Sequence, residues 1–119
     1  MRNAFALGAV LFSAAALHAP GAFADSARDN ILKAEAQIQA LNPADANAAS
    51  PADYQAAQTR LGEAKAAEAR NKREESVWRS DEAAVQADIV QERIKLRALD
   101  RTVSEIETGI ETLRRELKS

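Results

Sequence analysis

The stretch LRALDRTVSEIETGIETLRREL, residues 96–117, decides the fold of this chain. Its large aliphatic residues recur in alternating steps of three and four without a miss, which is the spacing of the a and d positions of a coiled coil. An apolar stripe of this kind on one face of a helix requires a partner to cover it. We call these residues the seam: Leu96, Leu99, Val103, Ile106, Ile110, Leu113 and Leu117.

The N-terminal residues have the order of a secretory signal peptide. Arg2 precedes an apolar run over residues 4–17, and small residues follow as far as Ala24. This order predicts a signal peptide over residues 1–24 with cleavage after Ala24, and therefore a periplasmic or secreted protein. The run is short for a bilayer and no second one follows, so we expect no stable membrane span. No cysteine follows the predicted cleavage site, so we expect no lipid anchor.

The composition of residues 25–119 favours one slender helical domain. The only histidine of the chain, His18, and all of its phenylalanines lie before the predicted cleavage site, and the whole chain has no cysteine. Tyr54 and Trp78 are the aromatic residues that remain. Much of the apolar content is alanine, which favours helices but buries little area, so a broad globular core is not expected.

The first helix of this domain is predicted to begin after Ser26, which can serve as its N-cap, and to end at Asn42-Pro43. Residues 42–51, with their two prolines and small polar residues, are predicted to form a loop. The apolar face of this helix has the same three-and-four spacing as the seam. It comprises Ala27, Ile31, Ala34, Ile38 and Leu41.

A second helix is predicted to start at Ser50-Pro51, because serine suits the N-cap, proline suits the first turn, and Asp53 follows three residues after the cap. The helix presents a face of mostly small residues, which allows another helix to approach closely. That face comprises Tyr54, Ala57, Leu61 and Ala64.

The region around Asn71 permits two arrangements: a tight turn at Asn71-Lys72, or one unbroken helix from Pro51 to the C-terminus. The unbroken helix would be about 100 Å long. We favour the turn, because the helices before it then match the long helix after it in residue count. The second helix is then too short to cover the long helix after it, so the first helix is expected to lie alongside residues 99–113. The predicted fold is all-α: an elongated antiparallel helical hairpin or coiled coil, with one arm broken by the proline-containing loop.

A second copy of the chain is the competing partner for the seam. In a parallel homodimer Leu96 would occupy an a position and Leu99 a d position, and the rest of the seam would follow in alternation. Lys95 could then pair with Asp100 of the partner, whereas Thr102 and Gly109 at the later flanking positions carry no charge. Both arrangements remain open from the sequence.

Trp78 lies on the backward extension of the seam, about two turns after the predicted reversal. It is expected to close the end of the hairpin as a buried plug, with an exposed anchor for a partner as the alternative. Glu82 and Glu92 interrupt the apolar spacing between Trp78 and Leu96, so looser packing is expected there. Tyr54 is expected to pack against the neighbouring helix.

The residue types of the domain exclude several kinds of chemistry. Nucleophilic catalysis by cysteine or by a serine-histidine pair, and a Cys/His zinc site, require side chains that residues 25–119 do not contain. Acidic pairs such as Asp88 and Glu92 are expected to be solvated helix surface rather than a calcium or acid-base site. Acidic residues interleave with the basic clusters, which argues against nucleic acid. We therefore expect no catalytic residues, no metal and no cofactor.

The segment ASPADYQAAQTRLGEAKAA, residues 49–67, resembles a family of small alanine-rich bacterial envelope proteins catalogued as domain of unknown function 4398. The similarity extends from Ile31 to about Ala67 and more loosely to Ala98. The resemblance implies an envelope location and a helical build, and members sometimes accompany peptidoglycan-binding domains of the OmpA type. Many members carry a lipoprotein cysteine that this chain lacks.

These observations favour a non-enzymatic periplasmic scaffold or adaptor that acts through protein-protein contacts of its helical faces. The alternative is a chaperone-like or envelope-binding module that holds a client protein or peptidoglycan between its helices. The partner in either case would be an envelope protein or polymer, or a second copy of the chain.

Overall fold

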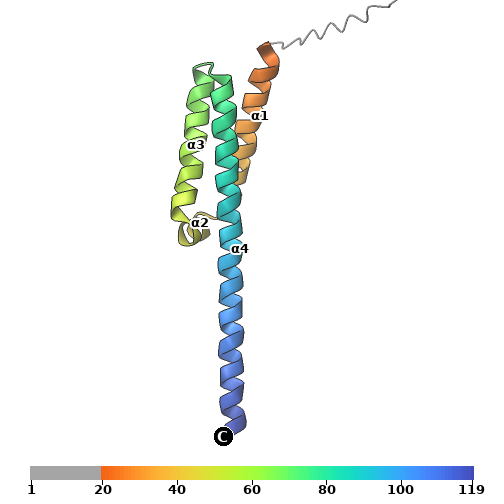
Figure 1. Cartoon of the computed structure of the whole chain (residues 1–119), viewed down its shortest axis with the longest axis vertical. Helices are drawn as coiled ribbons and strands as arrows, with labels where there is room; N and C mark the ends of the chain where they lie inside the picture. Colours follow the sequence, from red (N-terminus) through yellow and green to blue (C-terminus); the bar gives the residue numbers. More distant parts are fainter. Residues whose placement is uncertain (1–19) are drawn as a thin grey trace, which may run out of the picture.

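The computed structural model describes residues 20–119, which form four α-helices joined by short turns (Figure 1). The helices are α1 (Pro20–Gln39), α2 (Pro43–Ala49), α3 (Pro51–Ala69) and α4 (Arg73–Lys118). α1, α3 and the first half of α4 form a bundle, and the second half of α4 projects from it alone. The predicted all-α, elongated fold is confirmed. The predicted signal peptide lies for the most part outside the described residues.

The start of α1 differs from the prediction. The helix begins at Pro20, so Ser26 lies inside it and is not its N-cap. The predicted apolar face of α1 is confirmed, because every one of its residues is buried. A face of this spacing is set by the helical period and does not depend on where the helix begins.

The stretch predicted to be a loop contains a helix, α2. Asn42 caps it: the Asn42 side-chain oxygen accepts a hydrogen bond from the backbone N–H of Asp45 at 3.1 Å, and Pro43 occupies the first turn. Asn42-Pro43-Ala44-Asp45 repeats the pattern of Ser50-Pro51-Ala52-Asp53, which we did use as a helix start. The prediction was wrong because two prolines eight residues apart can each open a helix instead of breaking one.

α3 begins where the sequence predicted, with Ser50 at the cap position and Pro51 in the first turn. The contact differs in detail, since the Ser50 hydroxyl donates to the Asp53 carboxylate instead of accepting from a backbone N–H. Asp53 in turn lies 3.4 Å from Nε of Arg93 on α4. The start of α3 is thereby tied to α4 near the point where the bundle ends.

The predicted turn at Asn71-Lys72 is confirmed, and it reverses the chain between α3 and α4. Asn71 has a left-handed backbone with φ of 58°. The N–H of Lys72 donates to the carbonyl of Ala67, and the N–H of Asn71 donates to that of Glu68, each at 2.9 Å. This is the Schellman arrangement that ends many helices, with asparagine in the place usually taken by glycine.

Replacing Asn71 tests the turn. Asn71→Gly should raise the free energy of unfolding slightly, because glycine adopts a positive φ without steric cost. Asn71→Ala should lower it by about 1 kcal/mol, because alanine resists that conformation. Denaturant unfolding followed by circular dichroism measures both. If the two variants had equal stabilities, the chain would not reverse through a left-handed residue at this position.

Small residues form most of the contact between α3 and α4. Ala57 and Ala64 of α3 and Ala83 and Ala87 of α4 are buried or nearly so. Ser76 is buried with them, and its hydroxyl donates to the Ala64 carbonyl at 2.9 Å. Side chains of this size let the two helix axes approach closely over the whole length of α3.

Polar contacts fix the direction of each helix in the bundle. Asn30 donates to Asp81 at 3.3 Å and Gln37 to Asp88 at 3.2 Å, so α1 runs in the same direction as α4. α3 runs antiparallel to α4, because Arg60 of α3 pairs with Glu82 at 3.2 Å, whereas the earlier residue Asp53 pairs with the later residue Arg93. α3 is therefore antiparallel to α1 as well. The chain therefore folds back at α2, and α1 returns beside α3.

This arrangement corrects the predicted position of the first helix. α1 lies alongside residues 76–90 of α4 and not alongside residues 99–113. α1 and α3 do not follow one another along α4, because the chain reverses at α2 and its flanking turns. Both helices therefore lie on the first half of α4. α1 thereby buries Ile31 and Ile38 against the small-residue region, and the seam receives no cover from it.

A matched pair on α3 tests the close packing. Ala64 is fully buried, whereas Ala66, two residues away on the same helix, is exposed. Ala64→Leu should lower the free energy of unfolding by about 1–3 kcal/mol through overpacking. Ala66→Leu should leave it nearly unchanged, since both residues favour helices. Thermal or denaturant unfolding of the two variants gives the comparison, and equal effects would contradict a tight α3–α4 contact.

Candidate interaction surface

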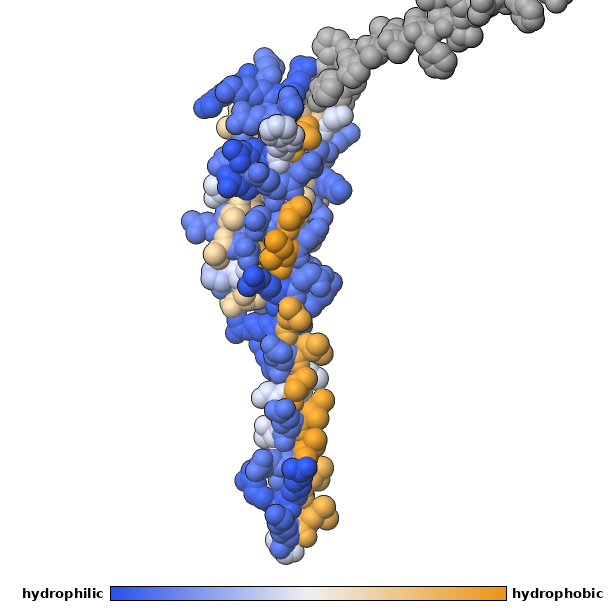
Figure 2. All heavy atoms as spheres, in the orientation of Figure 1, coloured by the Kyte–Doolittle hydropathy of each residue, from blue (hydrophilic) through white to orange (hydrophobic). Residues whose placement is uncertain are grey.

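The seam is exposed along its whole length. Its residues range from 45% exposed at Ile110 to 86% at Leu117. Figure 2 shows them as a continuous apolar stripe down one side of the projecting part of α4. Large aliphatic side chains exposed singly are ordinary, but a contiguous stripe on one helix face marks a contact surface.

The two long faces of α4 have different roles. One face carries Ser80, Ala83, Ala87 and Val90, which are buried against α1 and α3. The opposite face carries the seam. Its spacing continues upward along the bundle through Ile89, which is half-buried, and Val85, which is 56% exposed. The helices of the bundle therefore cover one face of α4 and leave the face with the seam spacing open (Figure 2).

Trp78 is not the buried plug that the sequence led us to expect. Its side chain is 63% exposed and borders a shallow surface hollow with Glu74, Glu75, Arg79 and Glu82. Ser76 and Ser80, on either side of it in sequence, take the buried positions at this end of the bundle. The face of α4 that meets α3 is offset from the seam spacing, and for this reason Trp78 points away from the bundle. Tyr54, in contrast, is buried as predicted.

The two glutamates that interrupt the apolar spacing have different surroundings. Glu82 accepts from Arg79 at 2.9 Å and lies 3.2 Å from Nε of Arg60. Arg60 also donates to Glu63, and this hydrogen bond holds the pKa of the Glu63 carboxyl below its usual range. Glu92 pairs only with Lys95 of its own helix, at 2.9 Å, among the ion pairs that the described residues show. The charge of Glu82 is thus more fully balanced.

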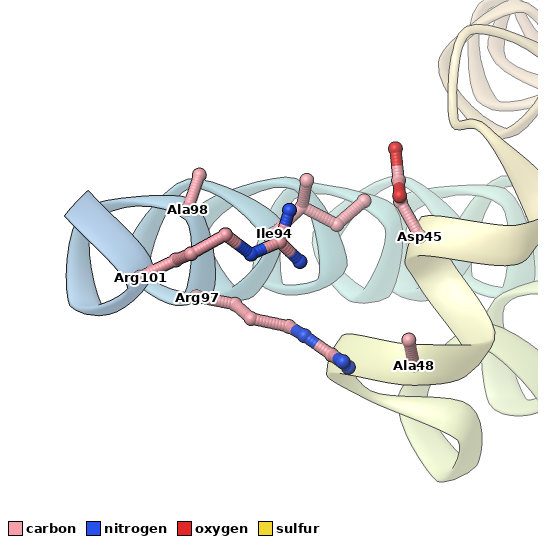
Figure 3. A pocket seen from close by; sticks show the side chains of 6 residues that line it. All are labelled: Asp45, Ala48, Ile94, Arg97, Ala98 and Arg101. Atoms are coloured by element: carbon pink, nitrogen blue, oxygen red, sulfur yellow. The ribbon is translucent and has the colours of Figure 1, made fainter. Parts of the chain in front are cut away.

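A pocket of about 200 Å³ lies where α2 meets α4. Asp45 and Ala48 line it from α2, and Ile94, Arg97 and Arg101 line it from α4 together with Ala98 (Figure 3). Arg97 and Arg101 lie on the same face of α4 as its buried residues but past the end of the bundle, where this face carries exposed charged side chains. All three charged side chains are exposed, so the pocket lacks the enclosed, water-poor environment of a catalytic site.

Two further features of the described residues bear on the kind of site. Among residues 20–119, no cluster of three or more His, Cys, Asp or Glu side chains is arranged to hold a metal ion. No helix in that range is both long and apolar enough to cross a bilayer. Most of the exposed large hydrophobic residues in the described part of the chain belong to the seam, which makes it the candidate binding surface.

Comparisons with protein-family models, with curated proteins and with solved structures find no match to this chain. The resemblance to the alanine-rich envelope family therefore stays a prediction.

The fluorescence of Trp78 tests its exposure, since the chain has a single tryptophan. At low protein concentration, emission should resemble that of tryptophan in water and should be readily quenched by acrylamide, because most of the indole lies in solvent. The matched probe is Trp78→Phe with Ser80→Trp, which places an indole at a buried position and should lower the stability of the bundle. Blue-shifted emission that resists quenching in the unmodified protein would contradict the position of Trp78.

Proposed function

We propose that this protein is a non-enzymatic helical scaffold or adaptor of the cell envelope that acts through protein-protein contacts of its seam. The exposed seam is the observation that carries the proposal. A rigid bundle holds one end of α4, and the other end presents a stripe of large aliphatic side chains that no other described helix covers. Such a surface matches the helix-to-helix mode of recognition, in which anchors repeat every three to four residues.

The shape of the molecule supports a spacing or presenting role. Residues 95–118 extend about 36 Å beyond the part of α4 that the bundle covers, at 1.5 Å per residue. The described residues contain the buried positions of a small-residue bundle at one end and an open contact surface at the other. The bundle can thus hold one end of α4 in place while the seam engages a partner at a distance from it.

The envelope location rests on the N-terminal sequence and is part of the same proposal. Export should release a protein that begins at Asp25, because the small residues before it are what signal peptidases accept. Mass spectrometry of the protein from fractionated cells measures this start. A cytoplasmic protein that retains residues 1–24 would contradict the location without bearing on the contact role of the seam.

Photo-crosslinking inside the cell tests the contact role. A photoreactive phenylalanine analogue replaces Ile106 in one variant and Thr108 in another. Ile106 belongs to the seam, whereas Thr108 lies on the opposite side of the same turn and bonds its hydroxyl to the Ser104 carbonyl. Illumination should give a discrete adduct from position 106 and little from position 108, because only the seam is in contact with a partner.

Equal adducts from both positions, or none from either, would overturn the proposal that the seam is a contact surface. The far-ultraviolet circular dichroism of both variants serves as the control for folding. Both variants should keep the helical signal of the bundle, since neither position touches the core formed by α1, α3 and the first half of α4.

A further inference from the structure

We infer that the occupant of the seam is a second copy of this chain, aligned parallel and in register, with the two α4 helices forming a coiled coil below and beside the bundles. The inference rests on the proposed function and names the partner for it. Three observations carry it: the lack of an internal partner, the composition of the projecting helix, and the charges that flank the seam.

No helix of the described chain is left to cover the seam. α1 and α3 both lie against residues 76–94 of α4, and α2 lies beside Ile94 at the end of the bundle. The polar contacts from Arg28 to Glu68 and from Lys65 to Glu35 join α1 to α3 and hold both in place. Once export has removed residues 1–24, as the proposed function has it, the helix that covers the seam comes from another molecule.

The projecting part of α4 is a poor helix when judged by its local sequence. Between residues 102 and 112 it contains Gly109 and several β-branched or serine residues, which have low helix propensity. A Cβ added at Gly109 would meet nothing within 4 Å, so no contact inside the chain explains the glycine. In proteins most of the stability of a helix comes from packing of its apolar face and not from local propensity. Burial of the seam against a partner supplies the stabilisation that the local sequence does not.

A parallel, in-register pair of α4 helices places every seam residue opposite its own copy. The alignment also brings Val85 and Ile89 of the two copies together, because the same spacing continues beside the bundle. These residues lie on the face that α1 and α3 leave open, so the bundles sit on the outer sides of the pair. The parallel alignment therefore covers the whole open stripe apart from its upper end.

The flanking charges are complementary in this alignment. In a parallel coiled coil each g position faces the e position that follows it on the partner. Lys95 then faces Asp100 of the other copy, which gives two attractive pairs across the dimer. Asp88 and Arg93 occupy the preceding flanking positions beside the bundle, where Gln37 and Asp53 of their own chain already bind them. At the remaining flanking positions a charged residue faces a neutral one; for example, Glu107 faces Thr102 of the other copy. No two like charges face each other on the flanks between residues 88 and 116.

The antiparallel alignments are less favourable. The alignment that sets Leu99 opposite Leu117 leaves Leu96, Ile89 and Val85 bare. It pairs Asp100 with Arg114 of the other copy, but it also brings the two copies of Glu107 together. Sliding the helices by one heptad to cover Leu96 places Asp100 opposite Glu107, a like-charge pair that costs stability. Coverage of the apolar stripe and the absence of like-charge pairs thus both favour the parallel, in-register pair.

One feature opposes the dimer and supplies a diagnostic. Glu92 occupies a core position, so the parallel alignment sets the two copies of its carboxylate side by side, with only Lys95 beside each. Glu92→Leu should therefore tighten the dimer by about tenfold. Neither antiparallel alignment brings the two copies of Glu92 together, but the one shifted by a heptad sets position 92 opposite Leu117. Tightening by Glu92→Leu therefore shows that position 92 lies in the core of the dimer, and the cysteine variants below determine the orientation.

Sedimentation equilibrium of the protein expressed from its full sequence tests the inference over about a hundredfold range of concentration. A reversible monomer-dimer equilibrium is expected. Ile106→Lys should raise the dissociation constant by at least about a hundredfold, because it buries a charge at the centre of the seam in both copies. The matched control Thr108→Lys, on the solvent side of the same turn, should leave the constant unchanged.

Single cysteines determine the orientation, since the chain has none of its own. Leu99→Cys and Leu113→Cys should each form a disulfide with the same residue of the partner under mild oxidation, because an in-register pair brings the two α-carbons within disulfide reach. Thr108→Cys should not, because position 108 points away from the partner. In both antiparallel alignments, positions 99 and 113 lie many residues from their own copies.

The outcomes separate this inference from the proposed function. A monomer at every concentration, a trimer or tetramer, or a dimer in which neither cysteine cross-links to itself would overturn the parallel homodimer. If the purified protein is a monomer while position 106 still forms an adduct of another mass in the cell, the contact role stands and the homodimer is excluded. If position 106 forms no adduct in the cell, the contact role fails as well.

Discussion

α4 is more than twice as long as α1 and α3, the two long helices that pack on it, and this mismatch governs the rest of the structure. At 46 residues it extends well past α3, which has 19. The turn at Asn71 fixes both helices at one end, so all of the excess length appears at the other end. The seam occupies that excess, and its exposure follows from the difference in length and from the direction that α1 takes.

The direction of α1 depends on the small residues at the centre of the bundle. Ala57, Ala64, Ala83 and Ala87 let α3 and α4 approach closely, and the shallow groove beside them accepts the larger Ile31 and Ile38 of α1. Large side chains are thus divided between two places: Ile31 and Ile38 of α1 fill the bundle together with Tyr54 and Val90, and those of the seam lie beyond it on α4. If α1 lay along the seam, the small-residue contact would lose its third helix.

Much of the fold was predictable because helical periodicity is a local property. The buried faces of α1 and α3, the turn at Asn71 and the length of α4 all follow from spacing, capping and charge. The position of α1 was not predictable in this way, because either half of α4 offers it a partner of compatible spacing. Which half of α4 packs against α1 depends on the reversal of the chain at α2. That stretch was predicted to be a loop, although Asn42-Pro43-Ala44-Asp45 carries a helix-start pattern. Trp78 was misplaced for a related reason, since the face that meets α3 is offset from the seam spacing.

Amide hydrogen exchange on dilute, monomeric protein tests most directly whether the seam lacks a partner within its own chain. The account predicts that amides of residues 76–94, which the bundle covers, exchange slowly, and that amides of residues 96–117 exchange much faster through local opening of an unsupported helix. Equal protection of the two segments in the monomer would show that another part of the chain covers the seam, and would contradict the account.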